Sequence, residues 1–243
     1  MKSGKCIFKK SLSVLALTVM VTLSLKACSK DEYPTGTIKV TTAKSTVGFT
    51  FRIPKDSQNL TIDWGDGKKS NVNDATYDVL LNEFRELLFS HEYSNTTERT
   101  IVISGSITDF NCRGMQVTHL DLSRIKTLVS LDCSENILTA LDVSTNTALN
   151  RLECDFNQLT TLDVSKNKSL SLLSCVANQL TAPALNNLFR TLPYKRGLEY
   201  NEGEAGFIFI SHRNPGPLDN PGVWDCDHSI AEEKGWIFMT LRH

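Results

Sequence analysis

A period of 21 residues runs through the middle of the chain and limits what the chain can fold into. Four cysteines recur at that step: Cys112, Cys133, Cys154 and Cys175. Apolar residues keep the same step in three further columns: Ile107, Leu128, Leu149 and Leu170; Phe110, Leu131, Leu152 and Leu173; and Val117, Leu138, Leu159 and Leu180. Several columns in phase indicate one supersecondary unit that is repeated along an axis.

One unit reads Leu128-x-x-Leu131-x-Cys133-x-x-Asn136-x-Leu138, which is the leucine-rich repeat pattern with cysteine in the third apolar position. Each unit predicts one short strand, and successive strands stack in parallel about 4.8 Å apart. An asparagine ladder, formed by Asn136, Asn157 and Asn178, is expected to bond backbone groups of neighbouring turns. The return segments, residues 118–123, 139–144 and 160–165, are expected to form a second strand-like or irregular edge.

The four repeated cysteines predict a structural ladder of buried free thiols. Stacked side chains point the same way, whereas a disulfide needs Cβ atoms that converge to about 3.5–4.5 Å. A metal site would need closer clusters such as Cys-x-x-Cys, and the sequence has none. We therefore expect no metal and no cofactor, and thiols that act as small hydrophobic groups.

The repeat pattern LxCxxNxLTxLDVSxN, over residues 106–181, resembles the cysteine-containing 21-residue repeats of internalin-type surface proteins. The resemblance implies a short leucine-rich repeat solenoid and a function in protein–protein contact or adhesion. Residues 182–243 are expected to cap the solenoid: 183–192 as a helix, 206–211 as a strand, 229–235 as a helix with a capping box at Ser229, and 236–239 as a last strand. This ending resembles that of bacterial surface leucine-rich repeat lipoproteins.

Short β-type runs precede the repeats, at residues 37–42, 47–53, 60–64 and 100–104. Together with Asp63-Trp64-Gly65-Asp66-Gly67, they resemble a PKD-type, immunoglobulin-like β-sandwich over residues 37–105. Residues 79–84 depart from that pattern and favour a helix. Asp63 and Asp66 are read as bracing the turn, with cation binding as the alternative. Trp64 is read as core, with sugar stacking as the alternative.

The first residues of the chain predict where the protein is located in the cell. Residues 1–27 contain five Lys and no acid, and an apolar run of signal-peptide length ends before Leu25-Lys26-Ala27-Cys28. That ending resembles a bacterial lipobox, which implies lipidation of Cys28 and a lipid-anchored tether at residues 28–36. The following Ser-Lys-Asp-Glu resembles the export signal of surface-displayed lipoproteins in Gram-negative bacteria. We therefore expect an outer-membrane protein that is exposed on the cell surface.

Charge and motifs narrow the function. Without residues 1–27 the 26 basic residues fall to 21 against 27 acidic ones, a net charge of −6, which excludes the basic footprint of a nucleic-acid binder. No nucleotide-binding loop, nucleophile elbow or zinc-protease motif is present, so we expect no enzyme. Asp225-Cys226-Asp227-His228 is read as a polar loop, with a metal site as the alternative.

The sequence thus predicts a mainly β chain that binds another macromolecule through the concave face of its repeats. The ligand-binding residues are expected among the outward positions of the middle units: Asp132, Ser134, Arg151, Glu153, Asp155 and Ser174. A surface glycan-binding protein that uses the Trp64 region is the alternative.

Overall fold

The computed structural model describes residues 35–195, 205–212 and 219–241 of the chain. Its described part is mainly β, as predicted. The elements before the repeats are β1 (Gly36–Thr42), β2 (Thr46–Pro54), β3 (Thr61–Asp63), β4 (Lys69–Asn71), the 3-10 helix η1 (Val72–Asp74), β5 (Tyr77–Leu81), β6 (Phe84–Glu92) and β7 (Arg99–Gly105). The remaining elements are β8 (Asp109–Asn111), β9 (Val117–Asp121), β10 (Ser130–Asp132), β11 (Arg151–Glu153), β12 (Leu172–Ser174), α2 (Ala182–Thr191), β13 (Gly206–His212), α3 (Ser229–Glu232) and β14 (Trp236–Leu241).

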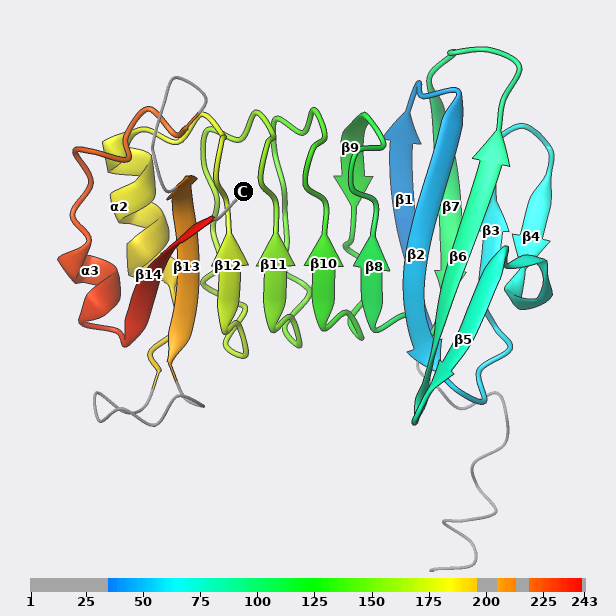
Figure 1. The fold of residues 1–243 in the computed structure, drawn as a ribbon, viewed down its shortest axis with the longest axis horizontal. Coiled ribbons are helices and arrows are strands. Elements are labelled where there is room, and N and C mark those ends of the chain that lie inside the picture. Colours follow the sequence, from blue (N-terminus) through cyan, green and yellow to red (C-terminus); the bar gives the residue numbers. More distant parts are fainter. Residues whose placement is uncertain (1–34, 196–204, 213–218, 242–243) are drawn as a thin grey trace, which may run out of the picture.

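The repeated units, called rungs below, stack in register. Each contributes one three-residue strand, and the strands β8, β10, β11 and β12 pair in parallel so that residues 21 apart lie side by side (Figure 1). Leu131 pairs with Leu152, and Leu152 pairs with Leu173. The 21-residue step of the sequence is therefore one strand spacing in space.

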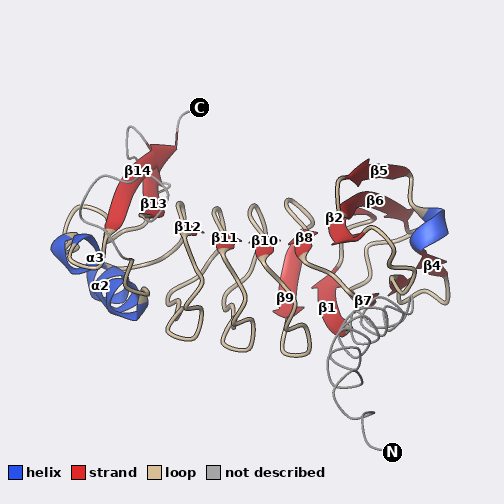
Figure 2. Ribbon diagram, turned by 90° about the horizontal axis from the view of Figure 1, so that it is seen from below, coloured by secondary structure: helices blue, strands red, loops and turns tan. Residues whose placement is uncertain are grey.

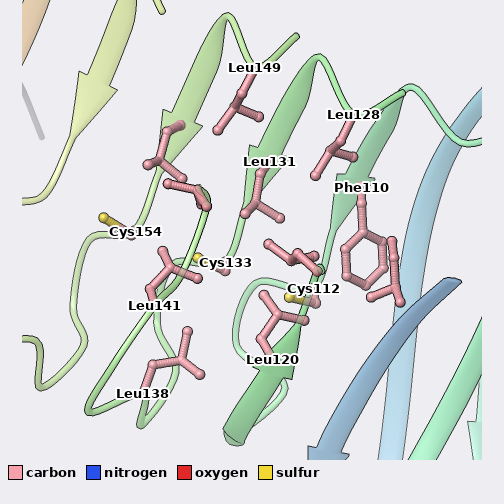
Figure 3. Packing of buried hydrophobic residues seen from close by; sticks show 14 of the residues in the cluster. Phe110, Cys112, Leu120, Leu128, Leu131, Cys133, Leu138, Leu141, Leu149 and Cys154 are labelled. Carbon is pink, nitrogen blue, oxygen red and sulfur yellow. The ribbon is translucent and has the colours of Figure 1, made fainter. Parts of the chain in front are cut away.

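The core of the stack is a set of vertical apolar columns. The leucine and cysteine side chains of successive rungs point into the space between the strands and the return segments (Figure 3). Cys133, Cys154 and Leu152 are all fully buried. The return segments of the second and third rungs carry no strand, yet Val143 and Val164 are also fully buried. These segments therefore form an irregular edge that closes the core.

Each of the two sheets contains strands from the N-terminal region and strands from the repeats. One sheet has five strands in the order β4-β3-β7-β1-β9, and the other has nine in the order β14-β13-β12-β11-β10-β8-β2-β6-β5. The antiparallel pair β2–β8 joins the two regions, with Phe51 opposite Phe110. Since β1 also pairs with β9 of the first rung, the N-terminal region covers the end of the repeat stack.

The segment expected to be helical, residues 79–84, is instead part of a hairpin. Strands β5 and β6 pair in antiparallel register, with Leu81 opposite Phe84. Asn82 in the turn between them has a φ of 53°, a left-handed conformation that asparagine tolerates. An apolar run of this length fits either structure, and the tight turn with its long partner strand β6 decides for the hairpin.

The C-terminal elements follow the last rung as expected, except for one cap. Strand β13 adds to β12 in parallel, β14 adds to β13, and α2 and α3 lie beside them (Figure 1). Helix α3 begins after His228 without a side-chain cap, because the Ser229 hydroxyl donates to Asp227 instead. The predicted capping box is therefore wrong. Within the described residues, no helix has the length and apolar character needed to cross a membrane.

Candidate functional site: the outward face of the nine-stranded sheet

The nine-stranded sheet turns one face away from the core, and its strand registers define two continuous rows on that face. One row is Val79, Glu86, Arg52, Asp109, Ser130, Arg151, Leu172, Phe207 and Ile237. The other row is Tyr77, Leu88, Thr50, Asn111, Asp132, Glu153, Ser174, Phe209 and Met239. Nine strands at a spacing of about 4.8 Å make each row about 38 Å long.

The sheet is bowed toward this face. In Figure 2, β5–β6 at one end and β13–β14 at the other rise above the strands β8 to β12, while the return loops lie on the opposite side. We call the surface that the two rows form the trough. Its floor is formed by the rungs and its walls are formed by the two ends of the sheet.

The floor of the trough is charged. A groove of about 360 Å³ lies where β2 meets the first rungs. Its charged lining consists of four acids and two arginines: Glu86, Asp109, Asp132, Glu153, Arg52 and Arg151. Arg52 pairs with Asp109 at 3.1 Å and Arg151 pairs with Glu153. Asp132 takes part in no ion pair of the described chain, so the floor carries excess negative charge.

Both walls of the trough are apolar and exposed. At the C-terminal wall Ile237 is 45% exposed and Met239 is 42% exposed, beside the partly exposed Leu172, Phe207 and Phe209. At the N-terminal wall the exposed side chains are Tyr77, Leu81, Phe84 and Leu88. Contiguous exposed apolar surface with a polar surround is typical of a protein interaction site.

The six predicted ligand-binding residues divide into two groups. Asp132, Arg151 and Glu153 lie on the floor of the trough and reach solvent. Ser134, Asp155 and Ser174 are buried, so the prediction that they contact a ligand is wrong. For Ser134 and Asp155, which follow a cysteine, the outward alternation of the strand has ended, because the next residue turns with positive φ, as at Glu135 and Phe156. Ser174 precedes its cysteine and keeps its place in the row, where its hydroxyl bonds the Asp155 carboxylate.

Two of the buried residues form a polar pair beneath the surface. The Asp155 carboxylate accepts hydrogen bonds from the Ser174 hydroxyl at 2.6 Å and from the Val176 amide at 2.7 Å. Burial raises the pKa of the Asp155 carboxyl to about 6, and the charges of Glu153 and Asp132 add to the effect while the two hydrogen bonds oppose it. The rung-to-rung spacing at this position is therefore held by a titratable group.

The asparagine ladder fastens each rung to the one before it. The Asn157 amide donates to the carbonyls of Cys133 and Cys154, and its oxygen accepts from the Leu138 amide. Asn220 continues the ladder in the cap by donating to Cys175 and accepting from Leu180. The sequence reasoning missed Asn220, although it stands two periods of 21 after Asn178.

A second asparagine ladder, which the sequence reasoning also missed, lies under the return segments. The fully buried Asn146 and Asn167 each donate to two carbonyls of the preceding rung. Their 21-residue spacing was the signal that would have identified them.

The cysteines Cys112, Cys133, Cys154 and Cys175 are free and buried, and burial raises the pKa of each thiol well above its ordinary value.

The turn residues of the N-terminal region have local roles. Asp63 and Asp66 each accept a backbone hydrogen bond two residues ahead, from Gly65 and Lys68. Trp64 is 1% exposed and lies between the rings of Phe49 and His91. A sugar therefore has no access to Trp64 in the folded chain, and the alternative that placed glycan binding there is not supported by its position.

Metal-ligating side chains do not gather in the part of the chain that the structure describes: no group of three or more His, Cys, Asp or Glu is placed to hold an ion. Asp227 accepts from Ser229, and the His228 ring stacks on Phe238, as expected for a polar loop at a helix start. Cys28 lies outside the described residues, so its predicted lipidation stays a prediction.

The fold and the site define a mainly β protein with one long, exposed and bowed sheet face. A scan against protein-family models finds no match, and neither does a search of curated proteins. Among solved structures the chain is similar to one described as the functional domain of InlJ from Listeria monocytogenes, including a cysteine ladder, with 21% identity and a TM-score of 0.33. The likeness covers 61% of this chain and 44% of that one, so this chain spans less than half of its length.

Proposed function

We propose that the protein binds another protein in the trough. The observation that supports this most is the arrangement of one continuous face, in which a charged floor with excess negative charge lies between two exposed apolar walls. Folding leaves Ile237 and Met239 more than two fifths exposed, and a partner would remove that surface from water. We infer a partner that presents apolar side chains at the ends of its contact surface and a basic side chain over Asp132.

This proposal includes finer statements about the architecture. We infer that residues 106–181 form a leucine-rich repeat solenoid, which the in-register parallel strands and the asparagine ladder support. We infer that residues 37–105 form an immunoglobulin-like sandwich of the PKD type, supported by strands distributed over two sheets. The role is recognition without catalysis, and the buried thiols and the scattered histidines favour that reading over chemistry.

Site-specific photocrosslinking on intact cells that produce the protein tests the trough. A benzoylphenylalanine at Ser130, on the floor, is expected to capture a partner protein, whereas the same group at Ser144, on an exposed return segment, is not. Asp132→Lys should reduce capture roughly tenfold or more, because a like charge then faces the partner's basic group. Asp142→Lys, a matched reversal on a return segment, should leave capture unchanged. Equal capture from Ser130 and Ser144 would remove the trough as the binding face.

We also propose that the protein is attached to the outer membrane through lipid on Cys28 and is displayed at the cell surface. Several acyl chains give stable anchoring where a single chain gives only weak binding. Radiolabelled palmitate is expected to enter the wild-type protein and not Cys28→Ala. Accessibility of the trough to externally added protease or antibody then separates surface display from an inward-facing anchor.

A further inference from the structure

A second groove lies away from the trough, along the edge of the sheet where the asparagine ladder runs. It has a volume of about 640 Å³ and is lined by residues of the second, third and fourth rungs and by cap residues between 219 and 224. Its lining includes Phe156, Gln158, Gln179, Asp219, Pro221 and Trp224. None of these residues belongs to the two rows of the trough, so a ligand here would occupy a separate surface.

Trp224 is the feature that sets this groove apart. Its side chain is 75% exposed, while the other two tryptophans of the chain, Trp64 and Trp236, are buried to within 2% of their surface. The backbone around Trp224 is firmly held. The Gly222 amide donates to the Leu180 carbonyl. The Asn220 side chain donates to the Cys175 carbonyl and accepts from the Leu180 amide. A Cβ on Gly222 would lie 1.9 Å from the Ala182 nitrogen, so glycine is needed for this close approach.

The polar groups that line the groove are mostly neutral amides. The ladder asparagines Asn157 and Asn178 use their amides within the stack, as does Asn220. The side chains of Gln158 and Gln179 are exposed and make no hydrogen bond within the described chain. Among the residues that the structure describes, Asp219 is the one charged residue of the lining, and none of the lining residues is basic. This composition does not suit a nucleic acid, a phosphate or an acidic peptide.

An exposed indole beside free amides matches the chemistry of a saccharide. A sugar ring has an apolar C–H face, which packs on an aromatic surface, and hydroxyl groups at its edge, which donate to and accept from amides. Gln158 and Gln179 occupy the same position in successive rungs, because their backbone N–H groups donate to the carbonyls of Leu138 and Leu159. They are therefore about 4.8 Å apart. That step is close to the length of one pyranose unit. We propose that this groove, the amide groove, binds a neutral oligosaccharide, with one ring stacked on Trp224 and the next rings bonded to Gln179 and Gln158.

The placement of the three tryptophans supplies a direct assay on the full-length protein. Iodide quenches exposed indoles, so the quenchable part of the fluorescence reports Trp224 alone. Chitotetraose, cellotetraose, maltotetraose and mannotetraose are titrated as neutral probes at up to millimolar concentration. At least one of them is expected to protect the quenchable signal, and the same saccharide should show saturable heat of binding by calorimetry.

Three variants decide between a built site and simple shielding. Trp224→Ala should abolish the heat of binding, and Gln158→Ala combined with Gln179→Ala should weaken binding about tenfold, since two hydrogen bonds are lost. Met239→Ala, in the trough wall, should leave saccharide binding unchanged, which keeps this test independent of the proposed protein partner. Circular dichroism confirms that each variant is folded. Failure of every tetrasaccharide to protect Trp224, or an affinity that the double glutamine change leaves unaltered, overturns the proposal.

Discussion

The buried Asp155 carboxyl makes a quantitative prediction about stability and pH. In the folded chain its pKa is raised to about 6, from an ordinary value of 3.8, chiefly because burial disfavours the charged form. The difference of about 2 pKa units corresponds to about 3 kcal/mol, at about 1.4 kcal/mol per unit. The folded state binds the proton more tightly than the unfolded chain. Stability from this group is therefore greatest below about pH 4 and falls as the pH rises to about 6.

Asp155→Asn removes the titration while keeping the local contacts. Both hydrogen bonds to the Asp155 carboxylate reach a single oxygen, Oδ1, which an asparagine also carries. The variant and the wild type should have similar free energies of unfolding at pH 4. At pH 7 the variant should be more stable by about 3 kcal/mol, because the wild type then holds a buried charge.

Urea unfolding followed by circular dichroism at pH 4, 5, 6 and 7 measures this difference directly. Asp142→Asn is the matched control on an exposed return segment, where hydrogen bonds from Ser144 lower the pKa of the carboxyl. Stability from Asp142 is lost only as the pH falls below about 4, so its difference from the wild type should be constant between pH 5 and 7. A difference for Asp155→Asn that stays flat from pH 4 to 7, or that grows toward acid pH, would refute the reasoning.

Three further predictions concern the ladders and the turns. Asn157→Ala should lower the free energy of unfolding by roughly 3 kcal/mol or more, because it leaves buried carbonyls and the Leu138 amide unpaired. Asn150→Ala, at an exposed position, should lower it by less than about 1 kcal/mol in the same urea titration. The four ladder thiols should not react with a chromogenic disulfide reagent in the native protein and should all react in guanidinium chloride, since they are fully buried with raised pKa values; rapid native reaction would contradict this packing. Gln116→Gly should stabilise the fold by about 1 kcal/mol, because φ at this residue is 52°. Lys126→Gly, at an exposed position without positive φ, should destabilise the fold. An equal loss in the urea midpoints of both variants would rule out backbone strain at Gln116 as the cause.

The 21-residue period carried most of the information about the stack, because each repeated position has one fixed place relative to the rung below. Its limits lie where alternation ends. Asp155 and Ser134 follow a cysteine that points inward, so simple alternation predicts them outward, but the left-handed residue that comes next turns them under the surface. Nothing in a single rung announces that φ, since Glu135 and Phe156 are residues that seldom adopt it.

The trough as a whole was beyond sequence reasoning for a different reason. Its N-terminal wall depends on the pairing of β2 with β8, which joins Arg52 to Asp109 across 57 positions of the chain without any shared motif. Its C-terminal wall depends on β13 and β14 continuing the same sheet. Trp224 was likewise hidden: a tryptophan in a loop of the cap gives no sign from sequence that it stays outside the core.

Because the rungs in the middle of the molecule contact only their neighbours, their number is a free variable that leaves both ends intact. Duplication of one 21-residue segment inside the gene would move the two apolar walls apart by about 4.8 Å and add two more side chains to the floor. Under the proposed function, chains of this kind with more or fewer copies would bind partners of larger or smaller span with the same two apolar walls.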